Sequence, residues 1–99
     1  MVLTVLEAQV PLGQEAALQA AYQAATTADL PAGPVRTELL RDSRDATRWR
    51  IQTWWASREA LDAMRRSGTP AGVLMFRAAG AEPALSIFDV VSTLPRGAT

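Results

Sequence analysis

Two segments at opposite ends of the chain alternate with the period of a β-strand, yet each carries apolar residues on both faces. In residues 2–10 the two alternating sets are Val2, Thr4, Leu6, Ala8 and Val10, and then Leu3, Val5, Glu7 and Gln9. Residues 84–93 show the same character in the run Leu85-Ser86-Ile87-Phe88-Asp89-Val90-Val91. A strand with apolar residues on both faces has to be covered on both sides. The fold therefore needs two covers for the sheet that holds these strands.

The residues between these strands predict helices and a hairpin. From Gln14 to about Ala28 the apolar residues recur at helical spacing, at Leu18, Ala21, Tyr22 and Ala25. Residues 35–41 and 47–55 predict two strands joined by the polar turn 42–46. Ser57 is a typical N-cap for a helix over 58–66 that ends at Gly68. Thr69 and Pro70 predict the N-cap and first residue of a further helix, which runs through Arg77 and stops at Gly80.

The resulting order, β-α-β-β-α-α-β, predicts an α+β fold. It matches the ferredoxin-like split βαββαβ unit, with an antiparallel four-stranded sheet, one added helix and a single domain over residues 1–99. The helices of such a unit cover only one face of the sheet. A second copy of the chain is the simplest cover for the other face. We therefore expect a homodimer formed through the open sheet face.

Composition excludes several classes of partner and cofactor site. The 99 residues have a formal net charge of zero, which gives no electrostatic attraction to nucleic acid or to an anionic membrane. No apolar run approaches the roughly 20 residues of a membrane span. The opening residues 1–6 resemble a strand rather than a signal peptide, so we expect a cytoplasmic protein. Histidine and cysteine are both absent, which removes imidazole and thiolate ligands, and we expect no metal or cofactor.

All three tryptophans lie where the third predicted strand meets the following helix. Alternation puts two sets of side chains on opposite faces, namely Trp49, Ile51, Thr53 and Trp55, and Arg48, Arg50, Gln52 and Trp54. A tryptophan at such a junction suits a core or the wall of a pocket for a flat aromatic ligand. The residues alone leave both roles open for Trp55. Trp54 faces the expected partner and is interpreted as an interface anchor.

The stretch Trp55-Ala56-Ser57-Arg58-Glu59-Ala60-Leu61-Asp62-Ala63 resembles the W-x-S-x-E-A-h-x-A signature of the antibiotic-biosynthesis-monooxygenase domain, part of the dimeric α/β-barrel superfamily. The resemblance covers nearly the whole chain and implies a dimeric α/β barrel. It also implies an oxygenase that uses no metal, flavin or haem. In such enzymes a bound phenol or anthrone loses a proton, and its electron-rich anion reduces dioxygen. The superfamily also includes haem degraders and isomerases.

The resemblance implies a pocket between sheet and helices that is walled by Trp55 and binds a flat aromatic or polyketide-like molecule. Trp55, Tyr22 and Arg77 are the candidate catalytic residues, because each carries a hydrogen-bond donor for a substrate oxygen. For Arg77 the alternative is a solvated charge at a helix end. Four apolar residues are expected to contact the substrate, namely Ile51, Leu61, Met64 and Leu18.

Several positions depart from the pattern of the family. Ile51, Leu61 and Met64 stand where relatives carry an asparagine, a tyrosine and a histidine, respectively. The first-strand asparagine and ligating histidine of haem-degrading relatives are also missing. Asp89 and Glu7 are interpreted either as proton acceptors or as salt-bridge partners. These departures support a second hypothesis, a non-catalytic dimer that binds a hydrophobic ligand. A cyclase or isomerase is the third.

Overall fold

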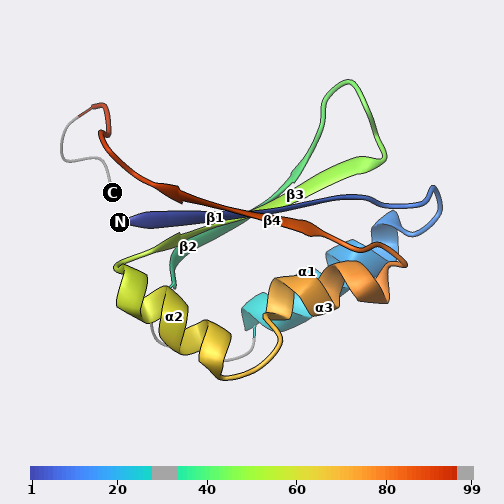
Figure 1. Cartoon of the computed structure of the whole chain (residues 1–99). Coiled ribbons are helices and arrows are strands. Elements are labelled where there is room, and N and C mark those ends of the chain that lie inside the picture. The colour runs from blue at the N-terminus through green and yellow to red at the C-terminus, as the bar shows by residue number, and fades with distance from the viewer. Residues whose placement is uncertain (28–33, 96–99) are drawn as a thin grey trace.

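An antiparallel four-stranded sheet in the order β2-β3-β1-β4 forms the framework of the chain. The structure is a computed structural model that describes residues 1–27 and 34–95. Its elements are β1 (Val2–Gln9), α1 (Glu15–Thr27), β2 (Pro34–Arg41), β3 (Arg48–Trp55), α2 (Arg58–Arg66), α3 (Ala71–Ala78) and β4 (Ala84–Asp89). The helices all lie on one face of the sheet, and the other face is open (Figure 1). This arrangement confirms the predicted α+β, ferredoxin-like fold.

The predicted boundaries differ from the structure mainly at the last strand and at the start of the third helix, and the other described ends agree within one residue. The last strand ends at Asp89 instead of continuing to Thr93, because its partner β1 begins at Val2, directly opposite Asp89. A final backbone bond from the Val90 N–H to the carbonyl of Met1 closes this edge at 3.1 Å. At α3, Pro70 occupies the N-cap position instead of the first helical turn. The predicted end of the first helix, Ala28, lies outside the described residues.

The turn into α2 forms as the sequence predicts. The Ser57 side chain caps the helix by accepting a hydrogen bond from the Ala60 N–H at 3.1 Å. At the other end Ser67 is the C-cap, and Gly68 follows with a φ of +135°. This left-handed region is open to glycine because it has no Cβ. Arg65 and Arg66 lie in the last turn, where positive charge is favourable to the helix dipole.

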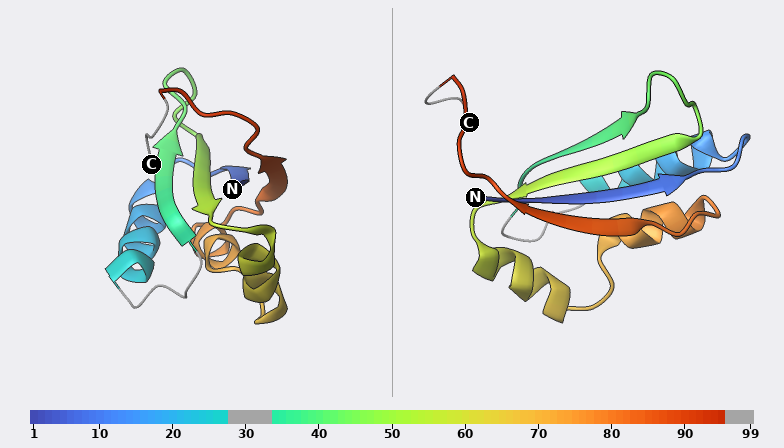
Figure 2. Two further views of the ribbon diagram at one scale, coloured as in Figure 1. Left: turned by 90° about the vertical axis from the view of Figure 1, so that its left-hand side faces the viewer. Right: turned by 45° about the horizontal axis from the view of Figure 1, so that its top comes forward.

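The helices pack on the sheet in two groups with a space between them. Helices α1 and α3 pack against each other over one half of the sheet, and α2 lies apart from them (Figures 1 and 2). The larger core cluster contains fully buried Val10, Leu18 and Phe76. A smaller cluster joins Val2 and Trp55 to Leu61 of α2. The molecule therefore has two cores, one beneath each group of helices.

The open sheet face is partly apolar and partly charged. At one end the register places Leu3 of β1 opposite Trp54 of β3 and Phe88 of β4. Phe88 is 52% exposed in the single chain. Farther along, Glu7 lies 3.3 Å from Arg50 in an ion pair. The faces predicted for Trp54 and Trp55 are confirmed, because Trp55 is buried on the helix side and Trp54 lies on the open side.

Candidate functional site

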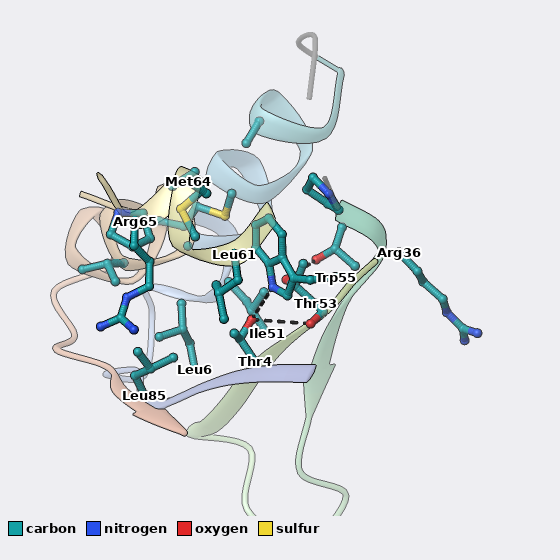
Figure 3. A pocket seen from close by; sticks show the side chains of 18 of the residues that line it. Thr4, Leu6, Arg36, Ile51, Thr53, Trp55, Leu61, Met64, Arg65 and Leu85 are labelled. Carbon is teal, nitrogen blue, oxygen red and sulfur yellow. Dashed lines mark hydrogen bonds between the residues drawn. The ribbon is translucent and has the colours of Figure 1, made fainter. Parts of the chain in front are cut away.

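A cavity of about 380 Å³ lies between the sheet, α2 and α3 (Figure 3). Its floor is formed by side chains of β1, β2 and β3, and its roof by α2, α3 and the segment that joins them. Helix α1 also contributes to the lining, through Tyr22 and Ala25. Most of its lining is apolar and includes Leu6, Ile51, Leu61, Met64, Val73 and Met75. The cavity therefore occupies the space between the two cores, where α2 diverges from the pair formed by α1 and α3.

Gly72 allows α3 to begin very close to the floor of the cavity. A Cβ atom at this position would lie 2.6 Å from Cδ1 of Leu6 and 3.8 Å from Cδ1 of Ile51. The first distance is shorter than van der Waals contact, so a side chain here would displace Leu6. The absence of a side chain at residue 72 thus sets how near the helix approaches the floor.

Three threonines form a polar row across the floor. Thr4 of β1 pairs with Thr53 of β3, and Thr53 pairs with Thr37 of β2, so the three side chains share one face. The hydroxyls of Thr37 and Thr53 lie 3.3 Å apart in a hydrogen bond that either can donate. One bond uses one of the two O–H protons. Within the described residues the second proton has no acceptor, which leaves this pair one donor for a ligand.

Trp55 belongs to both the core and the cavity. Its side chain is buried and packs with Leu61, and it also lines the cavity. The indole Nε1 donates to Oγ1 of Thr4 at 3.0 Å, and Thr4 donates in turn to the carbonyl of Thr53 at 3.4 Å. The N–H that sequence analysis assigned to a substrate oxygen therefore already has an acceptor in the protein.

The structure brings five of the seven predicted site residues to the cavity. They are Trp55, Tyr22, Ile51, Leu61 and Met64. Leu18 does not line it, because this residue is fully buried in the core beneath α1. Arg77 does not line it either. Its guanidinium is exposed on α3 and makes two hydrogen bonds to Glu82, at 3.0 and 2.9 Å.

Arg77 and Glu82 neutralise each other in an ion pair on the surface. The ion pair with Glu82 raises the pKa of Arg77, mainly through the hydrogen bonds between the two side chains. The same bonds lower the pKa of Glu82. Both side chains are solvent-exposed, so the pair contributes little to stability. Arg77 is therefore a solvated charge at the end of a helix, which was the alternative to a catalytic role for this residue.

No carboxylate of the described residues lines the cavity. Glu7 faces the open side of the sheet, where Arg50 and Arg48 lie 3.3 and 3.6 Å from it. Asp89 is exposed at the end of β4. Both residues thus lie away from a ligand in the cavity.

The polar row and the cation of the cavity were not predicted from the sequence. Alternation placed Thr53 on the same face as Trp55, but nothing local indicated that Thr4 and Thr37 would lie beside it. Arg65 lines the cavity from the last turn of α2, a position at which the sequence indicated only a favourable dipole interaction. Arg36 also borders the cavity, but its side chain points away in Figure 3 and stacks over Trp54 on the open face.

Residues 1–27 and 34–95 contain neither a cluster of metal-ligating side chains nor a helix able to span a membrane. These residues contain no group of three or more acidic, histidine or cysteine side chains able to hold a metal ion. None of the helices described has both the length and the apolar character needed to cross a bilayer.

Comparisons with solved structures show that the fold of this chain is shared with known proteins. Similar crystal structures include a candidate antibiotic biosynthesis monooxygenase from Deinococcus radiodurans, with 12% identity, a TM-score of 0.73 and coverage of 95% of this chain and 96% of that one. SnoaB, a cofactor-independent oxygenase from Streptomyces nogalater, has 21% identity, a TM-score of 0.71 and the same two coverages, 95% and 96%. A point mutant of MhuD with two manganese protoporphyrin IX molecules bound per active site has 22% identity, a TM-score of 0.71 and coverages of 95% and 98%.

Identities this low establish a common fold and do not by themselves transfer an activity. No curated protein matched the chain. The sequence model of the antibiotic biosynthesis monooxygenases matches residues 1–71, which is well over half of the 99 residues. The chain therefore belongs to the antibiotic biosynthesis monooxygenase family.

Proposed function

We propose that the chain is a cofactor-independent monooxygenase that oxidises a flat aromatic or polyketide-like molecule in the cavity beneath α2 and α3. The observation that carries this proposal is the cavity itself, which combines an apolar lining with a small polar row on its floor. Its volume of about 380 Å³ lies within the range of sites that bind small molecules. Membership of the family supports the reaction class.

The reaction needs an anion of the substrate that is rich enough in electrons to reduce dioxygen. For an anthrone, loss of a proton gives an enolate that reacts with dioxygen. One oxygen atom becomes the new quinone carbonyl and the other leaves as water. Preorganised hydrogen-bond donors stabilise such an anion. The free O–H of the Thr37 and Thr53 pair and the hydroxyl of Tyr22 are the proposed donors.

Trp55 has a positioning role in this proposal. Because its N–H is bonded to Thr4, the indole offers the substrate an apolar face, together with Ile51, Leu61 and Met64. No carboxylate of the described residues lines the cavity, so the substrate proton passes to water at the cavity mouth. This route restricts the reaction to substrates that are already acidic, such as phenols and anthrones.

We also propose that the active form is a homodimer joined through the open sheet face. Leu3, Trp54 and Phe88 form an apolar group on that face, and Phe88 is 52% exposed when the chain is alone. Contiguous exposed apolar side chains on a soluble domain are typical of an interaction site. A second copy would cover this group and complete a barrel from two sheets.

Oxygen consumption with anthrone and with 2-naphthol tests the reaction. We expect uptake of one dioxygen per anthrone and formation of anthraquinone. The double substitution Thr37→Val and Thr53→Val keeps the shape of both side chains and removes both hydroxyls of the pair, so it should lower the rate about tenfold to a hundredfold. Arg77→Gln is the matched control outside the cavity and should leave the rate unchanged. Equal rates for the wild type and this double variant would contradict the proposed donor.

A non-catalytic binding protein is the second candidate, because the cavity combines an apolar lining with no carboxylate from the described residues. Anthrone binding, measured by calorimetry under nitrogen, separates the two. Binding without any oxygen uptake in air would favour the second candidate. A cyclase or isomerase would instead convert its substrate without consuming oxygen.

A further inference from the structure

Arg65 is a charged residue in the lining of the cavity. It lies in the last turn of α2, and its side chain lines the cavity. Figure 3 shows this side chain extending from α2 toward Leu85 of β4, on the opposite side of the view from Trp55 and Thr53. Leu85 is 45% exposed, which places this part of the lining at the mouth. Arg65 is itself exposed, so its guanidinium borders both the cavity and solvent.

Within the described residues no carboxylate neutralises this guanidinium. The ion pairs there involve Arg36, Arg48, Arg50, Arg58 and Arg77. Arg65 has no acidic oxygen within the 4.0 Å of an ion pair and no hydrogen bond from its side chain to another described residue. Its five N–H donors are thus available to a ligand.

The cavity accordingly has two different polar regions separated by an apolar one. The donor pair Thr37 and Thr53 lies on the floor beside Trp55. Arg65 lies at the mouth, across the apolar side chains of Leu6 and Ile51 (Figure 3). A neutral hydroxyl suits the first region. An anion suits the second, because a guanidinium forms charge-assisted, often paired hydrogen bonds with a carboxylate.

We propose that the ligand of this cavity is an acidic aromatic molecule, whose ring fills the apolar region and whose carboxylate binds Arg65 at the mouth. A hydroxyl or carbonyl at the other end of the ring would then reach the threonine pair. This inference rests on the proposed function in that the same cavity binds the substrate. It adds the substrate class, an aromatic acid, and assigns Arg65 as the residue that selects it.

Isothermal titration calorimetry with two probes of almost equal shape tests the proposal. The probes are 6-hydroxy-2-naphthoate, which has its hydroxyl and carboxylate at opposite ends of the rings, and its neutral methyl ester. We expect the wild type to bind the carboxylate about tenfold more tightly than the ester. This preference should shrink as salt is raised, because the guanidinium borders solvent.

Arg65→Gln should abolish the preference and leave the affinity for the ester unchanged, which also shows that the variant is folded. Arg66→Gln is the matched control, because Arg66 is the neighbouring arginine and does not line the cavity. It should keep the preference. Equal affinities of the wild type for the two probes, an undiminished preference in Arg65→Gln, or no binding of either probe would each overturn the proposal.

Measuring oxygen uptake with the same two probes tests the proposed reaction independently of the proposed ligand class. A preference that depends on Arg65, without oxygen uptake, would support the acidic ligand and contradict the oxygenase. Oxygen uptake with equal affinity for both probes would support the oxygenase and contradict the acidic ligand.

Discussion

The indole N–H of Trp55 donates to the hydroxyl of Thr4 over 3.0 Å, which ties β3 to β1 beneath α2. Trp55 is 4% exposed, and Thr4 is 8% exposed. The sequence left open whether Trp55 belongs to the core or to a pocket. In the structure Trp55 has both roles, because its side chain belongs to a buried cluster with Leu61 and also lines the cavity.

Thr4→Val should destabilise the fold by about 1–3 kcal/mol, because the buried indole N–H loses its acceptor. Thr4→Ser keeps the hydroxyl and should cost less. Urea unfolding of the two variants measures the difference. In a Trp55→Phe background, where the N–H is absent, the difference between the Val and Ser variants should become smaller. Equal stability of both Thr4 variants in the wild-type background would show that the hydrogen bond contributes nothing.

Gly72→Ala should destabilise the protein by about 1 kcal/mol and weaken ligand binding. The new Cβ would lie 2.6 Å from Cδ1 of Leu6 and would displace that side chain, which lines the cavity. Overpacking of about 1–3 kcal/mol is partly offset by the better helix propensity of alanine, about 1 kcal/mol. Thermal unfolding and calorimetry with 2-naphthol measure the two effects. Gly72→Ala combined with Leu6→Val should recover affinity, and a failure to recover would place the cause elsewhere.

Phe88→Arg should convert the proposed dimer into a monomer. The arginine would place an unpaired charge in the middle of the apolar group that a second copy covers. Phe88 is 52% exposed in the single chain, so the substitution should leave the monomer folded. Light scattering at micromolar concentration gives the mass, and circular dichroism checks the fold.

Leu12→Arg is the control for this substitution, because Leu12 is 74% exposed and lies in the turn after β1, outside the sheet. It should keep the dimer mass. A monomeric mass for the wild type would contradict the proposed assembly, and a dimeric Phe88→Arg variant would move the interface to another surface.

Asp45 should make the stability of the β2–β3 hairpin depend on pH in the acidic range. Hydrogen bonds from the hydroxyl and the backbone N–H of Thr47, at 2.6 and 3.0 Å, lower the pKa of Asp45. The folded protein therefore binds this proton less readily than the unfolded chain does. The stabilisation is present at neutral pH and is lost as pH falls through the lowered pKa. Asp45→Ala should be less stable than the wild type at pH 7 and approach it in strong acid.

Chemical unfolding of both proteins between pH 7 and pH 2 measures this difference. Because Asp45 is only partly buried, salt and solvent keep its contribution small. A stability difference that stays constant over the whole range would show that the protonation of Asp45 is not linked to folding.

Local features of the sequence were sufficient for the elements and for the faces of the strands. The Ser57 cap and the glycine after α2 depend on residues within a few positions of each other. Strand alternation has a period of two everywhere, so it separated Trp54 from Trp55 correctly. The end of β4 was not predictable in this way, because Asp89 is the last residue only where β1 supplies a partner.

The candidate site depended on contacts between distant parts of the chain. Leu18 and Tyr22 lie one turn apart on the same stripe of α1, yet Leu18 is fully buried in the core and Tyr22 reaches the cavity. Arg77 forms an ion pair with Glu82, which follows the end of α3. Sequence periodicity reports which side of an element is buried. Periodicity does not show at which residues two neighbouring helices separate and leave a cavity between them.

The row of three threonines shows most clearly how local sequence and tertiary structure contribute differently. From the sequence alone, Thr4, Thr37 and Thr53 are three unrelated residues of ordinary strands, and Arg65 is a favourable charge at a helix end. Strand register brings the threonines together, because each pairing aligns residues that are 16 or 49 positions apart. The divergence of α2 from α3 then opens the space above them. The sequence by itself determined the elements and their buried faces through local periodicity, whereas only the tertiary structure decided which side chains meet around a cavity.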